Sequence, residues 1–487
     1  MPNMTDNTLD PDDWEEIRKL GHTMMDDVID YLKNVRNQPV WKPVPAETKA
    51  FLNEAVPIAG LDAKDVYAQF KQHIFPYTKG NIHPRFWAWV QGTGLPIAVL
   101  GDFLASAMNP NVTIGEHSAM YVDRQVVNWC KQMMHYPDDA SGILLSGASM
   151  ANTTALIVAR NHMIAFARQS GLQSLSLNPV MYCSTETHSC ITKTAEIIGI
   201  GTSGLRKIPV YPDYTINLES LESAIVQDVK NGHNPFCVVG NAGTVNTGAI
   251  DDLQALKTLC VKYDLWFHID GAFGALAKLT DKFKQKLKPI EEADSVSFDL
   301  HKWMYMPYEV GCVLIKNKEA HRNSFSFAPN YLMTHEEGLA SGPESLNNYG
   351  IELSRGFKAL KVWMSIKEHG LLKFGLQIEK NIQQAAYLTE MIYLKPDLEL
   401  LAPTSLNIVC FRYTNIKLSN DHLNNLNKII VMQLHVQGIA SPSSTILNGN
   451  YAIRVAITNQ RSCKKDFDTL IEAVIKIGSE MIGQENF

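Results

Sequence analysis

From about residue 142 to residue 316, the chain alternates between short apolar runs and longer stretches with helical periodicity, and this alternation most constrains the fold. Such a pattern is typical of a largely parallel β-sheet that is covered by helices on both faces. We therefore predict an α/β fold with about seven mostly parallel strands, in which a ligand binds at the carboxyl ends of the strands. The predicted strands are 142–146, 180–185, 206–211, 236–240, 265–269, 294–298 and 311–316.

The regions before and after this alternation predict smaller units. Residues 14–35 carry apolar side chains at three- and four-residue spacing, which indicates an amphipathic helix that packs either within the chain or against a second subunit. After about residue 370, strand-like runs and amphipathic helical runs indicate a small α+β domain. We predict an N-terminal helical, dimer-forming segment at 1–88, a large cofactor-binding domain at 89–368 and a C-terminal domain at 369–487.

The composition of the 487-residue chain limits its partners. The 44 basic and 50 acidic side chains give a net charge of −6, which favours neither nucleic acid nor an anionic membrane as a partner. The eight cysteines lack the close spacing of a zinc site, which indicates reduced thiols in a cytoplasmic protein without a metal. No apolar run reaches the ~20 residues of a membrane span, and the polar N-terminus does not resemble a secretory signal.

The first chemical motif follows the predicted strand at 142–146. Gly147, Ala148 and Ser149 lie between this strand and a helical stretch that begins at Met150. Small residues at such a junction allow backbone N–H groups and the positive end of the helix to approach an anion. We predict a phosphate-binding loop here, with Ser149 adding a hydroxyl group. The loop lacks the lysine of a nucleotide-binding P-loop.

A buried carboxylate is predicted in the run His268-Ile-Asp270-Gly-Ala272, at the end of the strand at 265–269. A carboxylate in such a place requires a cationic partner. A protonated pyridine nitrogen would provide one, and Ala272 is small enough for a flat ring to lie against it. A structural hydrogen bond or a metal pair would also explain His-x-Asp considered alone.

Two further strand ends carry side chains that suit a cofactor. His188 follows the strand at 180–185, where its imidazole could stack on a planar ring and transfer protons. Thr244 follows the strand at 236–240, where its hydroxyl could contact a cofactor oxygen or the substrate. For a single histidine in such a place, ordinary packing is the alternative interpretation.

Lys302 follows the buried strand at 294–298 in the run Asp299-Leu-His301-Lys302-Trp303. Burial disfavours the charged form of a lysine, so an amine in this position indicates a chemical role. The leading candidate is a Schiff base between the amine and an aldehyde cofactor. A surface lysine that caps a strand end is the alternative for the His-Lys pair considered alone.

These strand-end residues belong to one predicted sheet, and their combination indicates pyridoxal phosphate (PLP). The phosphate would bind in the loop before the helix, and the ring would lie between His188 and Ala272. Asp270 would face the ring nitrogen, and Lys302 would bind the aldehyde carbon. Thr244 would contact the cofactor from the neighbouring strand end.

The chain resembles the group II pyridoxal-phosphate-dependent amino acid decarboxylases, and especially an aromatic-L-amino-acid-decarboxylase-like bacterial branch. The resemblance rests on the combination of His301-Lys302-Trp303 with the run from His268 to Ala272, and it extends from His83 to Asn459. It implies PLP fold type I. It also implies a homodimer with the active site at the subunit interface, where the N-terminal segment embraces the partner.

The resemblance further implies roles for single residues. The implied cofactor contacts are Ala148, Ser149, His188, Asp270, His301 and Lys302. Lys302 would be the Schiff-base lysine and His188 the stacking imidazole. Tyr331 matches a tyrosine on a mobile catalytic loop that returns a proton to Cα.

The residues expected to contact the substrate are Trp89 and Val90, in a run of aromatics that could also be ordinary core. We predict α-decarboxylation of an aromatic or large apolar L-amino acid to its amine and CO2. The alternatives with the same cofactor are an aminotransferase, an aldehyde-forming oxidative decarboxylase and a lyase. Arg454 or Arg355 could anchor the α-carboxylate in an aminotransferase, whereas Tyr331 argues against the aldehyde-forming branch.

Overall fold

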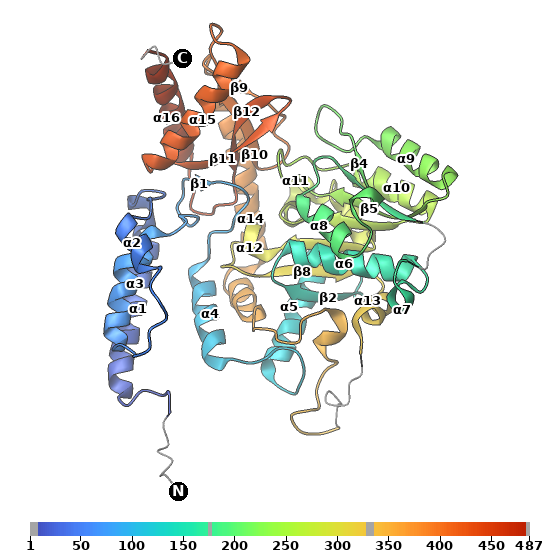
Figure 1. Ribbon diagram of the computed structural model, residues 1–487, viewed down its shortest axis with the longest axis horizontal. Coiled ribbons are helices and arrows are strands. Elements are labelled where there is room, and N and C mark those ends of the chain that lie inside the picture. The colour runs from blue at the N-terminus through green and yellow to red at the C-terminus, as the bar shows by residue number, and fades with distance from the viewer. Residues whose placement is uncertain (1–7, 174–177, 328–335, 484–487) are drawn as a thin grey trace.

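The central feature of the computed structural model, which describes residues 8–173, 178–327 and 336–483, is a seven-stranded sheet in the order β2-β8-β7-β6-β5-β3-β4 (Figure 1). Within this described sheet, β8 alone runs antiparallel to the other strands. The predicted α/β architecture is therefore confirmed. The strands are β2 (Ser141–Leu145), β3 (Pro179–Ser184), β4 (Leu205–Ile208), β5 (Asn234–Asn241), β6 (Trp266–Asp270), β7 (Ser295–Asp299) and β8 (Gly311–Ile315).

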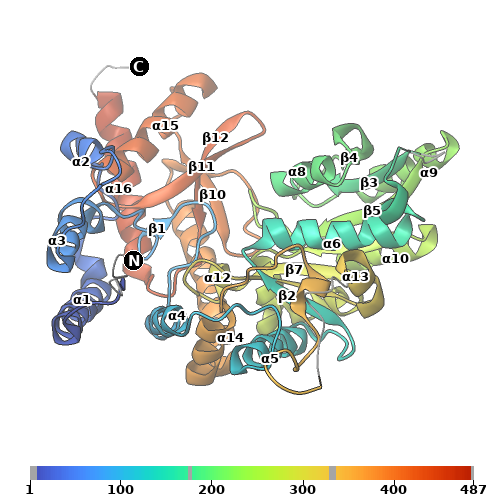
Figure 2. The same ribbon diagram turned by 60° about the horizontal axis from the view of Figure 1, so that its bottom comes forward.

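Helices cover both faces of this sheet, as Figure 2 shows. Some connections between strands run toward one edge of the sheet and others run toward the opposite edge. Because crossover connections between parallel strands are right-handed, the helices of these two groups lie on opposite faces of the sheet. One face carries α6 (Ala148–Met163) and α8 (Ser189–Ile197), which contact each other. The other carries α5 (Ser118–Met134), α9 (Leu218–Lys230) and α10 (Leu253–Tyr263). β6, β7 and β8 are buried along their whole length, which explains why their sequences are mostly apolar without alternation.

A smaller domain is built on a five-stranded sheet in the order β1-β11-β12-β10-β9. Its core lies between this sheet and two amphipathic helices, α15 (Asn420–Val436) and α16 (Lys464–Gly483), which the sequence predicts. The two-residue strand β1 pairs with β11 in parallel, so a segment that precedes the large domain in sequence joins the small sheet. The strands are β1 (Phe86–Trp87), β9 (Leu398–Leu400), β10 (Ile408–Tyr413), β11 (Ser441–Leu447) and β12 (Asn450–Ala456).

The long helix α14 (Ala359–Tyr393) connects the two domains. It is interrupted at Gly370, whose φ of 68° and ψ of 156° are not helical. Glycine adopts such a φ without a steric penalty. The N-terminal part of α14 packs on α4 (Pro96–Met108), and its C-terminal part packs on the small sheet. The domain boundary that the sequence suggests at residue 369 lies beside this interruption.

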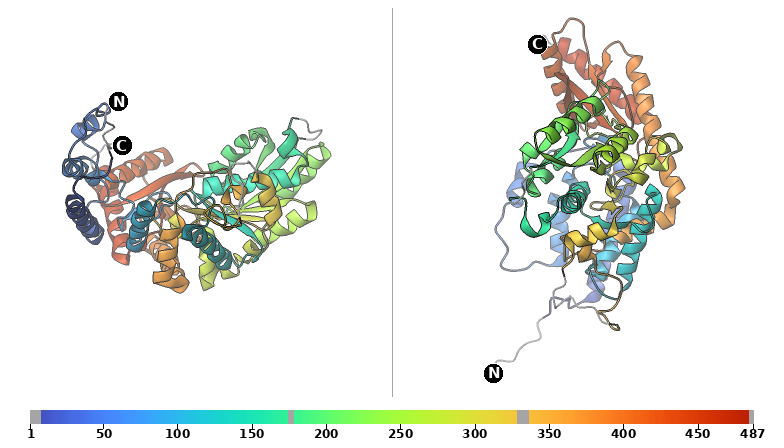
Figure 3. Two further views of the ribbon diagram at one scale, coloured as in Figure 1. Left: turned by 90° about the horizontal axis from the view of Figure 1, so that it is seen from below. Right: turned by 90° about the vertical axis from the view of Figure 1, so that its right-hand side faces the viewer.

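Three N-terminal helices lie at one end of the molecule, beside the small domain (Figure 3). They are α1 (Trp14–Asn34), α2 (Ala46–Phe51) and α3 (Ala63–His73). Asp27 of α1 accepts hydrogen bonds from Tyr67 and Lys71 of α3, yet in the described structure none of the residues of α1 is buried. In the described part of the chain, no helix combines the length and the apolar character that crossing a membrane requires.

Candidate active site

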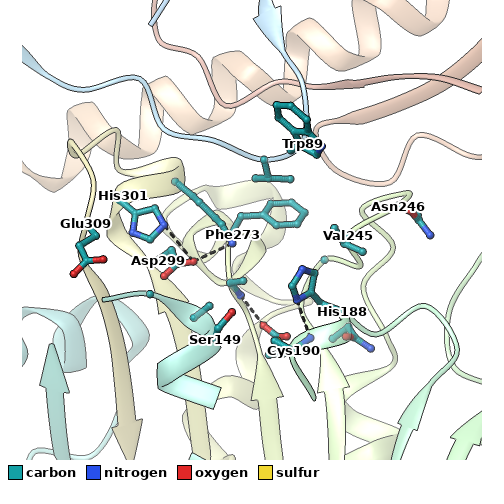
Figure 4. A pocket seen from close by; sticks show the side chains of 18 of the residues that line it. Trp89, Ser149, His188, Cys190, Val245, Asn246, Phe273, Asp299, His301 and Glu309 are labelled. Carbon is teal, nitrogen blue, oxygen red and sulfur yellow. Dashed lines mark hydrogen bonds and ion pairs between the residues drawn. The ribbon is translucent and has the colours of Figure 1, made fainter. Parts of the chain in front are cut away.

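A pocket of about 510 Å³ opens at the carboxyl ends of β2, β3, β5, β6 and β7, where the smaller domain faces the sheet. Parallel strands bring their carboxyl ends to one edge of a sheet, so residues far apart in sequence meet there. Figure 4 shows Ser149, Asp299 and His301 on one side of this pocket, His188 on the other, and Trp89 on the wall opposite the sheet. The sequence-predicted residues that line it are Trp89, Val90, Ala148, Ser149, His188, Asp270, Ala272, His301 and Lys302.

The start of α6 forms one side of the pocket. Gly147 precedes the helix, and no described side chain caps the first N–H groups of α6, so these donors are available to an anion. A Cβ atom at Gly147 would lie 3.2 Å from Cε1 of His301, which explains the small residue. Ser149 adds an exposed hydroxyl, and Ala148 is buried beside it.

Asp270 ends β6 at the floor of the pocket and is 5% exposed. Its Oδ1 accepts a hydrogen bond from the N–H of Ala272 at 3.1 Å, and among the described residues its carboxylate forms no ion pair. Burial raises the pKa of the Asp270 carboxyl, and the nearby Lys302 opposes this shift. The carboxylate thus lacks a direct cationic partner, which a protonated ring nitrogen would supply.

A chain of hydrogen bonds supports Asp270 from behind the pocket. Asn152 of α6 accepts from Nε2 of His268 at 2.8 Å, and Nδ1 of His268 contacts Oγ of Ser295 at 2.8 Å. Burial lowers the pKa of His268 to about 3, so this ring is neutral at ordinary pH. Nδ2 of Asn152 donates to Sγ of Cys190 at 3.4 Å, and the same amide lowers the pKa of the Asp270 carboxyl. Asn152 is fully buried, but a polar residue inside a helical run gives no distinct signal in the sequence, so it was not predicted.

Lys302 lies in the short helix α12 (Leu300–Trp303), directly after β7. Its Nζ is 2.9 Å from Oδ2 of Asp299, and its side chain is 21% exposed toward the pocket. Burial lowers the pKa of the amine, but the charge and hydrogen bond of Asp299 together with the charge of Asp270 raise it, and the net shift is upward. Asp299 is a second residue that the sequence argument missed, although a carboxylate three residues before the lysine was visible in the motif.

The two histidines of the pocket occupy different positions. His188 precedes α8, and its Nδ1 accepts a hydrogen bond from the N–H of Cys190 at 3.2 Å, which fixes the ring at the pocket wall. His301 is buried, with Nδ1 3.0 Å from the carbonyl oxygen of Val310 and Nε2 3.6 Å from Asp299. Burial lowers the pKa of both imidazoles. A neutral ring at His188 can lie against a planar group without a charge penalty.

The structure does not bring Thr244 into the pocket. The chain turns at Gly243, with a φ of 97°, and again at Gly248, so Thr244 points back into its own turn. Its hydroxyl accepts a hydrogen bond from the N–H of Ala249 at 3.1 Å and lies 3.1 Å from Oγ1 of Thr247. Thr244 is not among the residues that line the pocket, so its predicted contact with a cofactor stays a prediction. Tyr331 lies outside the described residues.

Comparison with known proteins identifies the chain. The family model described as "Pyridoxal-dependent decarboxylase conserved domain" matches residues 45–414. The chain belongs to the pyridoxal-dependent decarboxylase family. This decarboxylase is 35% identical to an aromatic-L-amino-acid decarboxylase of Bacillus atrophaeus, with 95% of each chain covered. It is 30% identical to tyrosine decarboxylase 4 of Petroselinum crispum, with 93% of this chain and 90% of that protein covered.

A solved structure agrees with these relatives. The crystal structure of Catharanthus roseus tryptophan decarboxylase in complex with L-tryptophan matches the decarboxylase with a TM-score of 0.85 and 25% identity, over 96% of this chain and 99% of that chain. The cofactor is therefore pyridoxal phosphate, and the chain is a carboxy-lyase. The residues present fit this cofactor, because the uncapped start of α6 suits the phosphate and the carboxylate of Asp270 suits a positively charged ring nitrogen.

Proposed function

We propose that this decarboxylase removes the α-carboxylate of an aromatic L-amino acid and releases the corresponding amine. The observation that carries the proposal is the meeting of Lys302, Asp270 and the uncapped start of α6 in one pocket. Bound pyridoxal phosphate supplies an electron sink for the pair left when the Cα–carboxylate bond breaks. The names of the relatives support an aromatic substrate, and Trp89 and Phe273 provide aromatic surface in the pocket.

The residues of the chain would act by binding, orienting and excluding water. Lys302 would hold the cofactor, and Asp270 would keep the positive charge on the ring nitrogen through a charge-assisted hydrogen bond. The start of α6 and Ser149 would bind the phosphate, while His188 would lie against the ring. Because these groups are fixed by strand ends before the substrate arrives, their charges need little reorganisation during the reaction.

The wall formed by Trp89 and Val90 is where the substrate side chain would bind. Val90 is buried, whereas Trp89 is 55% exposed and carries Nζ of Lys79 at 4.4 Å from its ring centroid. A flat aromatic side chain can pack between this wall and Phe273, which also lines the pocket. In the sequence, Tyr331 favours the return of a proton to Cα, and so favours an amine product over an aldehyde.

The geometry disfavours the aminotransferase alternative. Arg454 lines the pocket, but its guanidinium donates to the carbonyl oxygens of Trp89, Val245 and Asn246 and to Oγ of Ser443. Four of its five N–H groups are thus used within the protein, which leaves little for a substrate carboxylate. Arg355 lies outside the pocket lining, and its guanidinium binds the carbonyl oxygens of Val112 and Leu144.

We also infer a homodimer in which the N-terminal helices cover the partner subunit. Trp14 and Ile17 of α1 are 62% and 39% exposed, although they belong to the apolar stripe at 14–35. Phe103 and Met108 of α4 are 61% and 55% exposed. Large apolar side chains gathered on two helices favour burial against another surface. A second copy of the chain offers the same two surfaces.

A reducing compartment such as the cytoplasm is the proposed location. The eight cysteines, all within the described residues, are free, and seven of them are buried. Burial raises the pKa of Cys183 to about 11, so this thiol stays protonated and unreactive. Free buried thiols of this kind are typical of proteins that fold under reducing conditions.

The proposed reaction is tested by product analysis. The purified protein, loaded with pyridoxal phosphate, is incubated with L-tryptophan, L-tyrosine, L-phenylalanine and, as non-aromatic comparisons, L-glutamate and L-leucine. We expect CO2 and the amine in equal amounts from at least one aromatic substrate, without ammonia or hydrogen peroxide. Ammonia and peroxide released together with CO2 would indicate the aldehyde-forming reaction. Amino-group transfer without CO2 would contradict the proposal.

A further inference from the structure

Asp299 and Lys302 form a buried ion pair at the junction between β7 and α12. Oδ2 of Asp299 lies 2.9 Å from Nζ of Lys302, and the carboxylate side chain is only 2% exposed. The two residues are three positions apart, so the helical turn after the strand brings them to the same side. Both line the pocket, which places the pair at the point where the lysine amine must react.

The structure holds this carboxylate in one position. The N–H of Asp299 donates to the carbonyl oxygen of Ala272 at 2.8 Å, which ties the end of β7 to the loop that contains Ala272. A Cβ atom at Gly311 would come within 2.6 Å of Oδ1 of Asp299, so the neighbouring strand leaves room for the carboxylate only because it carries glycine. Among the described residues, Oδ1 has no hydrogen-bond partner, whereas Oδ2 contacts Lys302.

The ion pair creates a chemical requirement. A charged ammonium has no lone pair, so Lys302 must lose a proton before its nitrogen can bond to a carbonyl carbon. Burial disfavours release of that proton to bulk water, because an uncompensated carboxylate would remain behind. An acceptor in direct contact with Nζ removes this obstacle.

We propose that Asp299 is the proton acceptor of Lys302. One proton moves from Nζ of Lys302 to Oδ2 of Asp299, so that a charged pair becomes a neutral amine and a neutral carboxyl group. The net charge of the pocket does not change, and no other reactant is required. The inference rests on the proposed function in one respect, namely that Lys302 is the lysine that binds the cofactor.

The other titratable groups around Lys302 are less suited to this role. They are Asp270, His188, His301, Cys190 and Tyr308. Asp270 forms no ion pair with Nζ among the described residues, and it must stay ionised to serve the ring nitrogen. Tyr308 and Cys190 are weak acids whose pKa values are raised by burial, so neither provides a negative charge near neutral pH.

Attachment of the cofactor to the cofactor-free protein tests the proposal. The rate is followed by the visible absorbance of the bound cofactor, at several values between about pH 7 and 9, above the range where phosphate titrates. Borohydride reduction and peptide mass spectrometry then identify the modified lysine. If the proton stays inside the pair, the wild-type rate is nearly independent of pH across this range.

The Asp299→Asn variant removes the acceptor while it preserves the shape of the side chain. Asparagine also removes the negative charge that raises the pKa of the amine, so we expect the attachment rate to rise about tenfold per pH unit only below the lowered pKa of the buried amine and to level off above it. Glu309→Gln is the matched control, because Glu309 lines the same pocket but pairs with Lys358 at 3.4 Å. This control should retain the flat wild-type profile.

Two results would overturn the assignment of Asp299. One is a wild-type rate that already rises tenfold per pH unit, which can be measured even if the variant fails to fold. The other is an Asp299→Asn variant that attaches the cofactor as fast as the wild type at a pH where its own amine is still protonated, which would mean that Asp299 has only a structural role. Modification of a lysine other than Lys302 would instead contradict the proposed function, so the two failures are distinguishable.

Discussion

The carboxyl end of the large sheet and the N-terminal helices differ in whether a single chain provides partners for their side chains. At the sheet, Lys302 has its carboxylate at 2.9 Å, and Asp270 rests on a buried hydrogen-bond chain. In α1, none of the residues is buried in the described structure, and Trp14 is 62% exposed. Under the proposed function, one chain alone supplies the residues that would bind the cofactor, whereas α1 leaves large apolar side chains exposed for the proposed second subunit.

The largest effect is expected at the sheet, from Lys302→Ala. The variant removes the amine that we propose binds the cofactor, so kcat should fall by about four orders of magnitude, as when other enzymes lose the residue that forms the covalent bond. Steady-state CO2 release measures this loss, and size-exclusion chromatography should give the same oligomeric state as the wild type. Loss of the dimer in this variant would show that the two regions are not independent, and the comparison would fail.

An intermediate effect is expected at α1, from the double substitution Trp14→Ser and Ile17→Ser. Each large apolar side chain buried at an interface contributes about 1.5–3 kcal/mol, so the dimer dissociation constant should rise about 100-fold or more. Analytical ultracentrifugation measures the dissociation, and activity should fall at low protein concentration. The visible absorbance of the bound cofactor should persist, because the residues that would bind it lie in one chain.

Val261→Ser provides the matched control for this substitution. Val261 is 69% exposed on α10, at the opposite end of the molecule from α1. Its replacement should leave both the dissociation constant and the activity unchanged. An equal change in the control variant, or no change in the double variant, would contradict the assignment of α1 to the interface.

Much of the fold was predictable because the strands of the large sheet are buried on both faces. β6, β7 and β8 are buried throughout, which leaves a continuous apolar signature in the sequence. β11 was missed, because it contains Pro442 and three serines and depends on pairing with β1 and β12. Such pairing is a tertiary property that no local pattern reports.

The site was predictable only where backbone topology determines position. Asp270 and Lys302 follow neighbouring strands, so parallel pairing brings them to one pocket. Thr244 also follows a strand, but its hydroxyl bonds within its own turn, and such a contact is not visible in a motif. Asn152 and Asp299 act through contacts with other side chains, and these contacts require coordinates.

The smallest effect is expected behind the pocket, from Asn152→Ala. The variant removes the amide that lowers the pKa of Asp270, so this pKa should rise and the acid limb of the kcat–pH profile should move to higher pH by about half a unit to one unit. The sign follows because Asp270 must be ionised to act. His268 and Ser297 also lose their shared acceptor, which should lower the free energy of unfolding by about 1–3 kcal/mol.

Asn427→Ala separates the two consequences. Asn427 is equally buried, and its side chain binds the backbone of Tyr413 and Leu423 in the small domain, far from the sheet end. Its loss should lower stability by a similar amount and leave the pH profile in place. If both variants shift the acid limb equally, the shift reflects general loosening of the protein, and the hydrogen-bond chain behind Asp270 has no specific role. If Asn152→Ala alone shifts the acid limb, the buried side chains behind Asp270 also contribute to the function of the site.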